Sequence, residues 1–320
     1  MQLEEFHLWI LFVVIIGVTL FIDLGAVGNI KYKLKNKFEK VQTGKIYEGL
    51  SFKQSLIRSI VWIILAGIFA MVIFFVLGDQ KMLEFITGYV LEESLSVDNM
   101  MLFLLIFTTL GIPHKYQHRV LSVGILSAIV MRIIVILIGS SLLDSFHWMI
   151  YIFGGILLIG AFRMMFQNEE KIDLEKNLWV RVLKKIIPIR TKIINQGFLV
   201  KINGVLYATP LLVAMIVINM TDLVFAMDSI PAVLAITTDP FIVITSNIFA
   251  ISGLRALYFL ISSVIQKFYY IKFGLIVLLF FIGAKMLISE FYEISTVVSF
   301  IIVVLILIIV IIASILKTKN

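Results

Sequence analysis

Nine long stretches of mostly apolar residues dominate this sequence. They lie at about 8–26, 59–78, 83–110, 118–140, 147–166, 208–236, 241–264, 271–289 and 295–316. An α-helix needs roughly 20 apolar residues to cross a bilayer. The chain is 61% hydrophobic, whereas soluble domains are about 45–50% apolar. The sequence therefore predicts an all-α, polytopic membrane protein with about nine transmembrane helices.

The basic residues of the predicted loops all lie on one side of the membrane, except one. Two polar loops, about 27–58 and 167–207, hold most of them, and short loops and the C-terminal tail hold the others. The opposite side has only Lys81. The positive-inside rule therefore places the N-terminus outside and the C-terminus in the cytoplasm. We interpret the net charge of +7 as this topology signal, to which contact with anionic lipid of the bilayer can add, and we expect no nucleic-acid binding.

The third predicted helix carries an acidic stretch inside an apolar segment, EESLSVDN at 92–99. A charged side chain at mid-bilayer costs about 2.5–3.5 kcal/mol, so its three carboxylates need partners. At 100° per residue Glu92 and Asn99 share one helix face, with Ser96 beside them. Asp98 lies in a second polar row on this helix. The role of Glu93, about 100° from Glu92, is left open.

The sixth predicted helix carries a second acidic stretch with the same spacing. Glu92 and Asp98 are six residues apart, and so are Asp222 and Asp228. The spacing continues to cationic residues, because Asp98 precedes Arg132 by 34 residues and Asp228 precedes Arg255 by 27. The phrases IGAFRM at 159–164 and IGAKM at 282–286 then match each other. We interpret this series as a duplication.

The duplication predicts two three-helix repeats, the second inverted because three is an odd number. The repeats are 83–166 and 208–290, and 167–207 is a cytoplasmic linker. Outside them lie an N-terminal helix with a basic cytoplasmic loop (1–58), an accessory second helix (59–82), and a C-terminal helix with its tail (291–320). Inverted repeats are common in secondary transporters, which bind their substrate near the midplane between the repeats.

Two arginines lie near the middle of predicted helices, where a long side chain reaches water with difficulty. We expect Arg132 and Arg255 to pair with the buried carboxylates. Buried salt bridges that only hold the bundle together would explain these arginines. They would leave the surplus of acids and the nearby hydroxyls without a role.

The acidic stretches offer oxygen ligands and no thiols, since the sequence has no cysteine. Such sites suit hard divalent cations such as Mg²⁺, Ca²⁺ and Mn²⁺. Thioethers of Met100, Met220 or Met227 would shift selectivity towards a transition metal, although ordinary packing also explains them. Pro231 lacks an N–H and predicts local unwinding that frees the carbonyl of Met227 as a ligand. The acid-bearing helices are the longest predicted, which indicates a tilt or a break. Asp23, at the end of the first helix, has no assigned role.

Several motifs resemble those of the TerC family, membrane proteins first associated with tellurium resistance. They are EESLSVDN (92–99), GIP (111–113), YQHRVL (116–121), GIL (124–126) and TDLVFAMDSIPA (221–232). The resemblance covers roughly 60–290, and the extra N-terminal helices look like those of the longer, Alx-type members.

The resemblance implies an inner-membrane metal-ion transporter, with manganese export as the activity attributed to several members. It implies that the ion path is lined by Glu92, Asp98, Asp222 and Asp228, with Ser96 and Asn99 as supporting oxygens. Mn²⁺ is then the transported substrate, and no cofactor is implied.

Two other classes of function were weighed. The alternative is a non-transporting membrane scaffold for a stress or secretion complex, whose cytoplasmic loops dock partners. A membrane enzyme is not expected, because no nucleophile-plus-base set is present. The oligomeric state is not predicted, and a homo-oligomer is left open.

Overall fold

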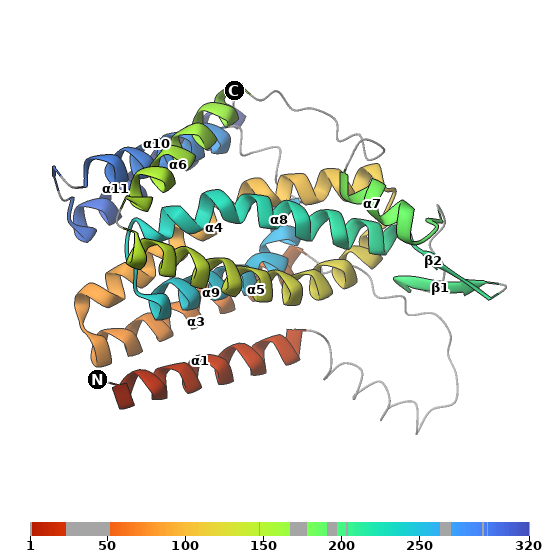
Figure 1. The fold of residues 1–320 in the computed structure, drawn as a ribbon, viewed down its shortest axis with the longest axis horizontal. Helices are drawn as coiled ribbons and strands as arrows, with labels where there is room; N and C mark the ends of the chain where they lie inside the picture. Colours follow the sequence, from red (N-terminus) through yellow and green to blue (C-terminus); the bar gives the residue numbers. More distant parts are fainter. Residues whose placement is uncertain are drawn as a thin grey trace.

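The computed structural model describes residues 2–23, 52–146, 148–166, 178–190, 197–202, 204–262, 270–289, 291–292 and 294–319. The helices are α1 (Gln2–Asp23), α3 (Phe52–Leu77), α4 (Asp79–Thr109), α5 (His114–Ser145), α6 (Met149–Phe166), α7 (Leu178–Ile186), α8 (Pro210–Leu234), α9 (Pro240–Ser262), α10 (Ile271–Ile288) and α11 (Thr296–Lys319). Two strands, β1 (Leu199–Ile202) and β2 (Val205–Ala208), pair as an antiparallel hairpin. Figure 1 shows the helices as one bundle with the hairpin at its end.

Every predicted membrane segment corresponds to one of these helices. Among the described residues, seven helices are long and apolar enough to cross a membrane. Two of the nine predicted membrane segments correspond to helices outside these seven. The apolar residues of α4 are interrupted by its acidic stretch, and the apolar part of α10, Phe273–Ile288, is shorter than a full membrane span. The protein is an all-α, polytopic membrane protein, as predicted, with one small hairpin in addition.

Three details of the prediction are wrong. Helix α3 begins at Phe52, inside the stretch 27–58 that was predicted as a loop. The linker 167–207 contains α7 and most of the hairpin rather than loop alone. The longest helix is α5 with 32 residues, ahead of α4 with 31 and α8 with 25. Helix length therefore does not single out the acid-bearing helices.

The sequence left a tilt or a break open for the acid-bearing helices, and both α4 and α8 are continuous. Helix α8 is continuous through Pro231 and ends only at Leu234. The proline removes one hydrogen bond, to the carbonyl of Met227, but the residues after it, Ala232 and Val233, are fully buried between other helices. Packing against neighbouring helices holds such a turn in helical geometry. The predicted unwinding is therefore not part of this fold.

Two glycines make the sharp turns at the ends of α4. Gly78, with φ of 95°, is the single residue between α3 and α4. Gly111, with φ of 60°, ends α4, and the Ile112 N–H donates to the Phe107 carbonyl at 2.8 Å. This 6→1 bond is the helix-ending motif that favours glycine at a left-handed position. Pro113 then precedes α5, which explains the GIP motif physically.

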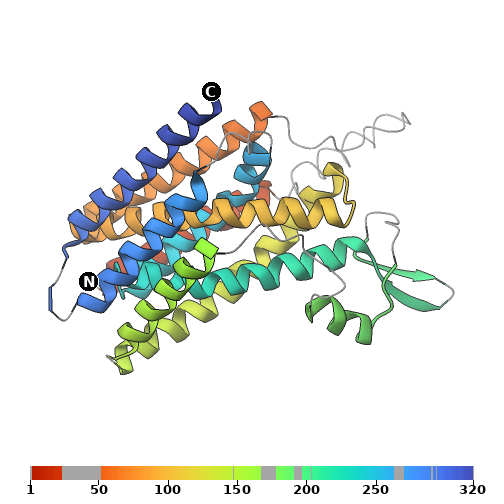
Figure 2. The same cartoon turned by 90° about the horizontal axis from the view of Figure 1, so that it is seen from above.

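The helices of the two predicted repeats pack in matching pairs. The closest packing joins α4 with α9, α5 with α8, and α6 with α10. If α4 is exchanged with α8, α5 with α9 and α6 with α10, the same three pairs of packed helices result. Helices α4 and α8 run in opposite directions through the bundle (Figures 1 and 2). Both features are what an inverted three-helix repeat predicts.

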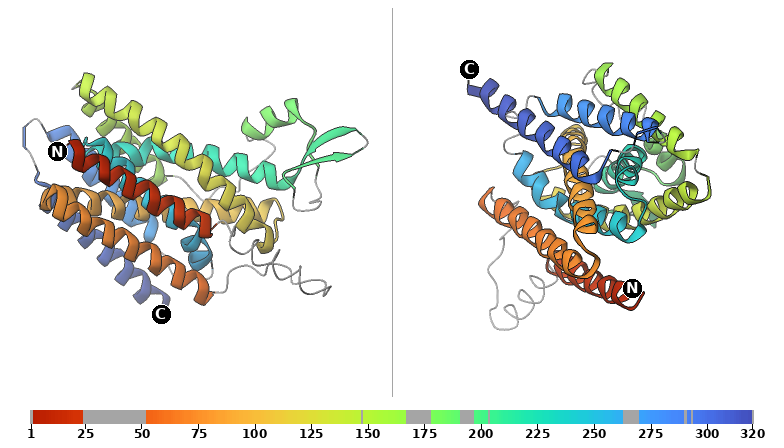
Figure 3. Two further views of the ribbon diagram at one scale, coloured as in Figure 1. Left: turned by 90° about the horizontal axis from the view of Figure 1, so that it is seen from below. Right: turned by 90° about the vertical axis from the view of Figure 1, so that its left-hand side faces the viewer.

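The contact between α6 and α10 depends on two glycines. A Cβ atom on Gly154 would lie 3.1 Å from the carbonyl oxygen of Gly283, and one on Gly283 would lie 3.0 Å from that of Gly154. Small residues let membrane helices approach at backbone distance. Helices α1, α3 and α11 lie around the outside of the bundle (Figure 3). Their many exposed Ile, Val and Leu side chains suit contact with lipid.

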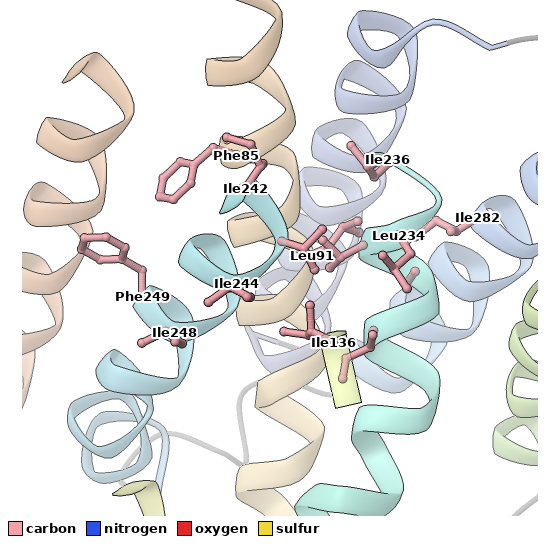
Figure 4. Close-up of a cluster of buried hydrophobic side chains, with 14 of the residues drawn as sticks. Phe85, Leu91, Ile136, Leu234, Ile236, Ile242, Ile244, Ile248, Phe249 and Ile282 are labelled. Atoms are coloured by element: carbon pink, nitrogen blue, oxygen red, sulfur yellow. The ribbon is translucent and has the colours of Figure 1, made fainter. Parts of the chain in front are cut away.

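The buried apolar residues form two main clusters. The larger joins residues of α4, α5, α8 and α9 with residues of the surrounding helices α1, α3, α6, α10 and α11, and Figure 4 shows part of it. Phe85 and Leu91 of α4 belong to it, with Ile136 of α5 and Phe249 of α9. The second cluster lies towards the end of the bundle where α4 ends, around Phe107. The polar residues of α4 and α8 lie between the two clusters.

Candidate ion-binding site

Arg132 of α5 lies at the centre of the site and contacts four side chains. Its Nη2 donates to Asp222 Oδ1 at 3.0 Å, and its Nε lies 3.4 Å from Asp222 Oδ2. Its Nη1 donates to a Glu92 carboxylate oxygen and to Asn247 Oδ1 at 3.0 Å, and lies 3.4 Å from Ser229 Oγ. A two-point contact between guanidinium and carboxylate is a strong, geometrically specific interaction. The ion pair predicted for Arg132 is therefore present.

The partners of Arg132 come from both predicted repeats. Glu92 lies on α4 of the first, whereas Asp222 lies on α8 and Asn247 on α9 of the second. Arg132 is 1% exposed, Glu92 0% and Asp222 4%. Charges this deeply buried are stable only when paired and hydrogen-bonded. One guanidinium thus links the two acidic stretches inside the bundle.

The helix face predicted for α4 is buried as a unit. Glu92 and Ser96 are 0% exposed and Asn99 is 3% exposed. Among the described residues, Glu92 Oε2 and Ser96 Oγ are buried atoms with no hydrogen-bond partner. Unpaired buried oxygens are costly and call for a ligand, a water or an ion. Ser96 therefore adds a free oxygen next to the Glu92 carboxylate.

The other two predicted acids cannot be placed in this site. The side chains of Asp98 and Asp228 lie outside the described residues, although their helices are described. Among the side chains that are described, no group of three or more His, Cys, Asp or Glu residues could hold a metal ion. The four-carboxylate site thus stays a prediction. The structure brings together two of its four members, Glu92 and Asp222.

Glu93 points away from Arg132. Its Oε1 accepts a hydrogen bond from the Tyr89 hydroxyl at 3.0 Å. The same oxygen lies 3.4 Å from the place where a Cβ of Gly253 would stand, beside Trp62. The Glu93 carboxylate therefore faces α3 and α9. Its role, left open by the sequence, is outside the Arg132 cluster.

A small cavity of about 20 Å³ lies directly beside Asp222. It is lined by Phe103 of α4, Leu121, Gly124, Ile125 and Ala128 of α5, Ile218, Asn219 and Asp222 of α8, and Ile251 and Leu254 of α9. A cavity of this size holds about one water molecule, since one needs ~10–15 Å³. Asn219 is its other polar residue, and the Asn219 amide donates to Ser127 Oγ at 2.7 Å. The cavity lies on the side of Asp222 towards the end of α4.

Arg132 and Arg255, which the spacing along the chain matched, do not lie opposite each other. The α9 residue that faces Arg132 is Asn247, whereas Arg255 lies eight residues farther along the helix, about 12 Å at 1.5 Å per residue. Arg255 Nη1 donates to Ser122 Oγ of α5 at 2.7 Å. Its predicted ion pair with a buried carboxylate stays a prediction. Asn247 was missed, although the run Thr245, Ser246 and Asn247 marks a polar stretch in this helix.

Closed packing separates the site from both ends of the bundle. On one side lies the apolar cluster of Figure 4, in which Leu91 and Ile136 are buried within four residues of Glu92 and Arg132. On the other side, beyond the cavity, the Tyr258 hydroxyl donates to Gln117 Oε1 at 3.0 Å. The ring of Phe107 packs edge-on against Tyr258 with centroids 5.8 Å apart. Packed residues therefore lie on both sides of the site, and its small cavity lies on the Tyr258 side.

An ionic network joins the elements at the end of the bundle where α4 begins. Lys81 Nζ lies 2.9 Å from Asp239 Oδ2 and 3.0 Å from Glu84 Oε2. Asp239 lies in the turn between α8 and α9, and its other oxygen accepts from the Phe241 N–H at 3.0 Å. The network thus ties the turn between two helices of the second repeat to the first helix of the other repeat.

We expect the Lys81–Asp239 contact to contribute about 1 kcal/mol to the free energy of unfolding, the upper range for partly exposed pairs. Thermal unfolding in detergent of Lys81→Met, Asp239→Asn and the double variant would measure it as a coupling energy. Asp239→Asn keeps an oxygen that can accept from the Phe241 N–H, so the helix start is preserved. Strictly additive effects of the two substitutions would contradict this expectation.

Comparison with known proteins places this arrangement in a family. Residues 77–320 match the integral membrane protein TerC family. The chain belongs to the TerC family. The match begins at the last residue of α3 and includes every helix that contributes to the Arg132 cluster.

Curated relatives cover most of this TerC-family chain. A Myxococcus xanthus protein, "Uncharacterized membrane protein STKORF319", is 42% identical over 271 residues, 85% of each chain. The Escherichia coli K12 protein "Putative membrane-bound redox modulator Alx" is 40% identical over 300 residues, 91% of this chain and 89% of its own. A Rickettsia felis "Uncharacterized membrane protein" is 37% identical over 309 residues, 97% of each. No solved structure matches the chain.

Proposed function

We propose that this TerC-family protein transports a hard divalent cation, Mn²⁺ first, across the cell inner membrane. One observation carries the proposal: Glu92 and Asp222, from oppositely oriented repeats, meet at a single buried cationic group between the two halves of the bundle. Secondary transporters with inverted repeats bind their substrates at such a midplane interface. Two carboxylates that hold one buried cation are suited to hold another in its place.

The donor atoms favour a hard cation. The described polar groups are carboxylate oxygens of Glu92 and Asp222, the hydroxyl of Ser96 and the amide of Asn99, and Mn²⁺, Mg²⁺ and Ca²⁺ prefer such oxygens. Asp98 and Asp228 would complete the ligand set. Mn²⁺ and the direction of export come from the TerC resemblance. The basic loops favour an external N-terminus and a cytoplasmic C-terminus.

The position of the cavity agrees with loading from the cytoplasm. The cavity lies on the side of Asp222 where α4 ends and α5 begins, and the basic residues Lys115 and Arg119 mark that end as cytoplasmic. The opposite side is filled by the apolar cluster around Leu91 and Ile136. An exporter would accept its ion from the side on which the cavity lies.

The name of the Escherichia coli relative includes a redox role. This sequence has no cysteine, so the chain itself carries no thiol–disulfide couple. A redox effect of such a protein would then follow from the metal it moves rather than from its own thiols. We therefore propose transport as the primary activity and not an enzymatic reaction.

The test is metal flux in sealed vesicles that contain the purified protein. Mn²⁺, Ca²⁺, Mg²⁺ and Zn²⁺ are supplied in turn, and internal metal is measured against time. We expect saturable Mn²⁺ flux that exceeds that of protein-free vesicles and that is lost in Asp222→Asn. Absence of flux for all four ions, or equal flux in Asp222→Asn, would contradict the proposal. Flux of another ion alone would replace Mn²⁺ and leave the site assignment in place.

A further inference from the structure

Arg132 occupies the same oxygens that the proposed function assigns to the transported ion. Both carboxylate oxygens of Asp222 face the guanidinium, and one oxygen of Glu92 accepts from Nη1. A divalent cation binds such oxygens at about 2.0–2.6 Å. The guanidinium and the metal would then be two cations separated by a single carboxylate oxygen inside a low-dielectric site, which is unfavourable. Glu92 and Asp222 can therefore serve Arg132 or the metal, but not both in this geometry.

We propose that Arg132 is a tethered counter-cation that exchanges with the transported ion. It offsets one of the two negative charges of Glu92 and Asp222 when the site is empty and leaves them when the ion binds. The empty transporter can then change its access from one side of the membrane to the other. This inference rests on the proposed function and assigns to Arg132 a step of the same transport cycle.

The surroundings of Arg132 provide for such an exchange. Its Nη1 already contacts two neutral acceptors, Asn247 Oδ1 and Ser229 Oγ, which would keep hydrogen bonds to the guanidinium after it leaves Glu92 and Asp222. The further acids predicted for the site, Asp98 and Asp228, would then balance its charge. The cavity beside Asp222 provides room on the other side of that carboxylate. Glu92 Oε2 and Ser96 Oγ have no partner among the described residues, so they offer a first contact to an arriving ion. An arginine with only a structural role would need neither free oxygens nor adjacent space.

The charge balance separates two steps of the cycle. Without Arg132 the empty site would hold Glu92 and Asp222 as unpaired charges in the middle of the membrane, which is costly. With the ion bound, both carboxylates have a cation whether or not Arg132 is present. Removal of the arginine should therefore slow the return of the empty transporter and spare the movement of the loaded one.

The experiment compares net transport with exchange in the same vesicles. Net transport, measured as Mn²⁺ uptake into metal-free vesicles, requires the return of the empty site. Exchange of radioactive Mn²⁺ for unlabelled Mn²⁺ on the other side requires only loaded movement. The variants are Arg132→Gln, which lacks the charge, and Arg132→Lys, which keeps it but cannot contact both carboxylates in the same forked geometry. Arg163→Gln is the matched control, because Arg163 is exposed on α6.

We expect Arg132→Gln to lose net transport by about 10-fold or more while exchange stays within about three-fold of wild type. Arg132→Lys should show a smaller fall in the ratio of net transport to exchange, and Arg163→Gln should show no fall in this ratio. Equal loss of both activities, or no loss of either, would overturn the inference. If Arg132→Gln does not fold, Arg132→Lys decides: a lowered ratio of net transport to exchange supports the inference, and a wild-type ratio refutes it. Wild-type vesicles with neither activity would instead refute the proposed function.

Discussion

Replacement of Arg132 by alanine is expected to lower the free energy of unfolding by about 3–5 kcal/mol, the range for breaking a buried ion pair by removing one partner. The substitution leaves Glu92 and Asp222 buried, charged and without their guanidinium, and removes a donor to Asn247. Unfolding of the purified protein in detergent, followed by helical circular dichroism, measures the change.

A charge-balanced variant is the control for this prediction. If Glu92→Gln and Asp222→Asn are added to Arg132→Ala, no unpaired charge remains. Removing all partners of a buried ionic group is far less costly than removing one. We therefore expect the triple variant to regain most of the lost stability. Arg163→Ala, at an exposed position, should change stability by less than about 0.5 kcal/mol. An Arg132→Ala protein as stable as the wild type would show that the cluster does not hold the two repeats together.

Two adjacent glutamates allow an equally sharp test of the transport site. Glu92→Gln is expected to reduce the apparent affinity for Mn²⁺ on the order of 100-fold, at the top of the 10–100-fold range for substitutions just outside a metal site. Glu93→Gln should leave transport near wild type, because the Glu93 carboxylate faces Tyr89 and Gly253 instead of Arg132. Both substitutions remove one carboxylate from the same helix turn and keep its size.

The measurement is Mn²⁺ flux in vesicles over a wide range of concentrations. Protein folding is checked by size-exclusion chromatography of each variant. Equal losses in Glu92→Gln and Glu93→Gln would mean that charge on this segment matters rather than the position of one ligand. A larger loss in Glu93→Gln would move the ion path to the face of α4 that packs on α3 and α9.

Most of the architecture could be predicted because lipid imposes a simple rule on the chain. A helix that crosses a bilayer needs a long apolar run, and hydropathy reveals such runs one at a time. The pairing of Arg132 with buried acids followed from the same physics, because a cation far from both surfaces must find a partner inside. The burial of Glu92, Ser96 and Asn99 on one face followed from helical periodicity.

The features that escaped prediction depend on contacts between helices. Spacing along the chain matched Arg132 to Arg255, but the helix crossing brings Asn247 to Arg132. Pro231 predicted an unwound turn, yet the burial of its neighbours keeps α8 helical. The hairpin of the linker is too short to show a strand pattern. In each case the deciding interactions lie between residues far apart in the sequence.

The one-residue connection at Gly78 has a consequence for the surrounding lipid. Gly78 keeps the end of α3 next to the start of α4, and the two helices also pack against each other, so we expect their movements to be coupled. Any movement of α4 that opens the site to either side must also shift α3, whose outer face carries exposed residues such as Ile60 and Ile64. Lipid molecules along this face would be displaced in every cycle. The rate of transport should therefore depend on bilayer thickness and lateral pressure as well as on the ion.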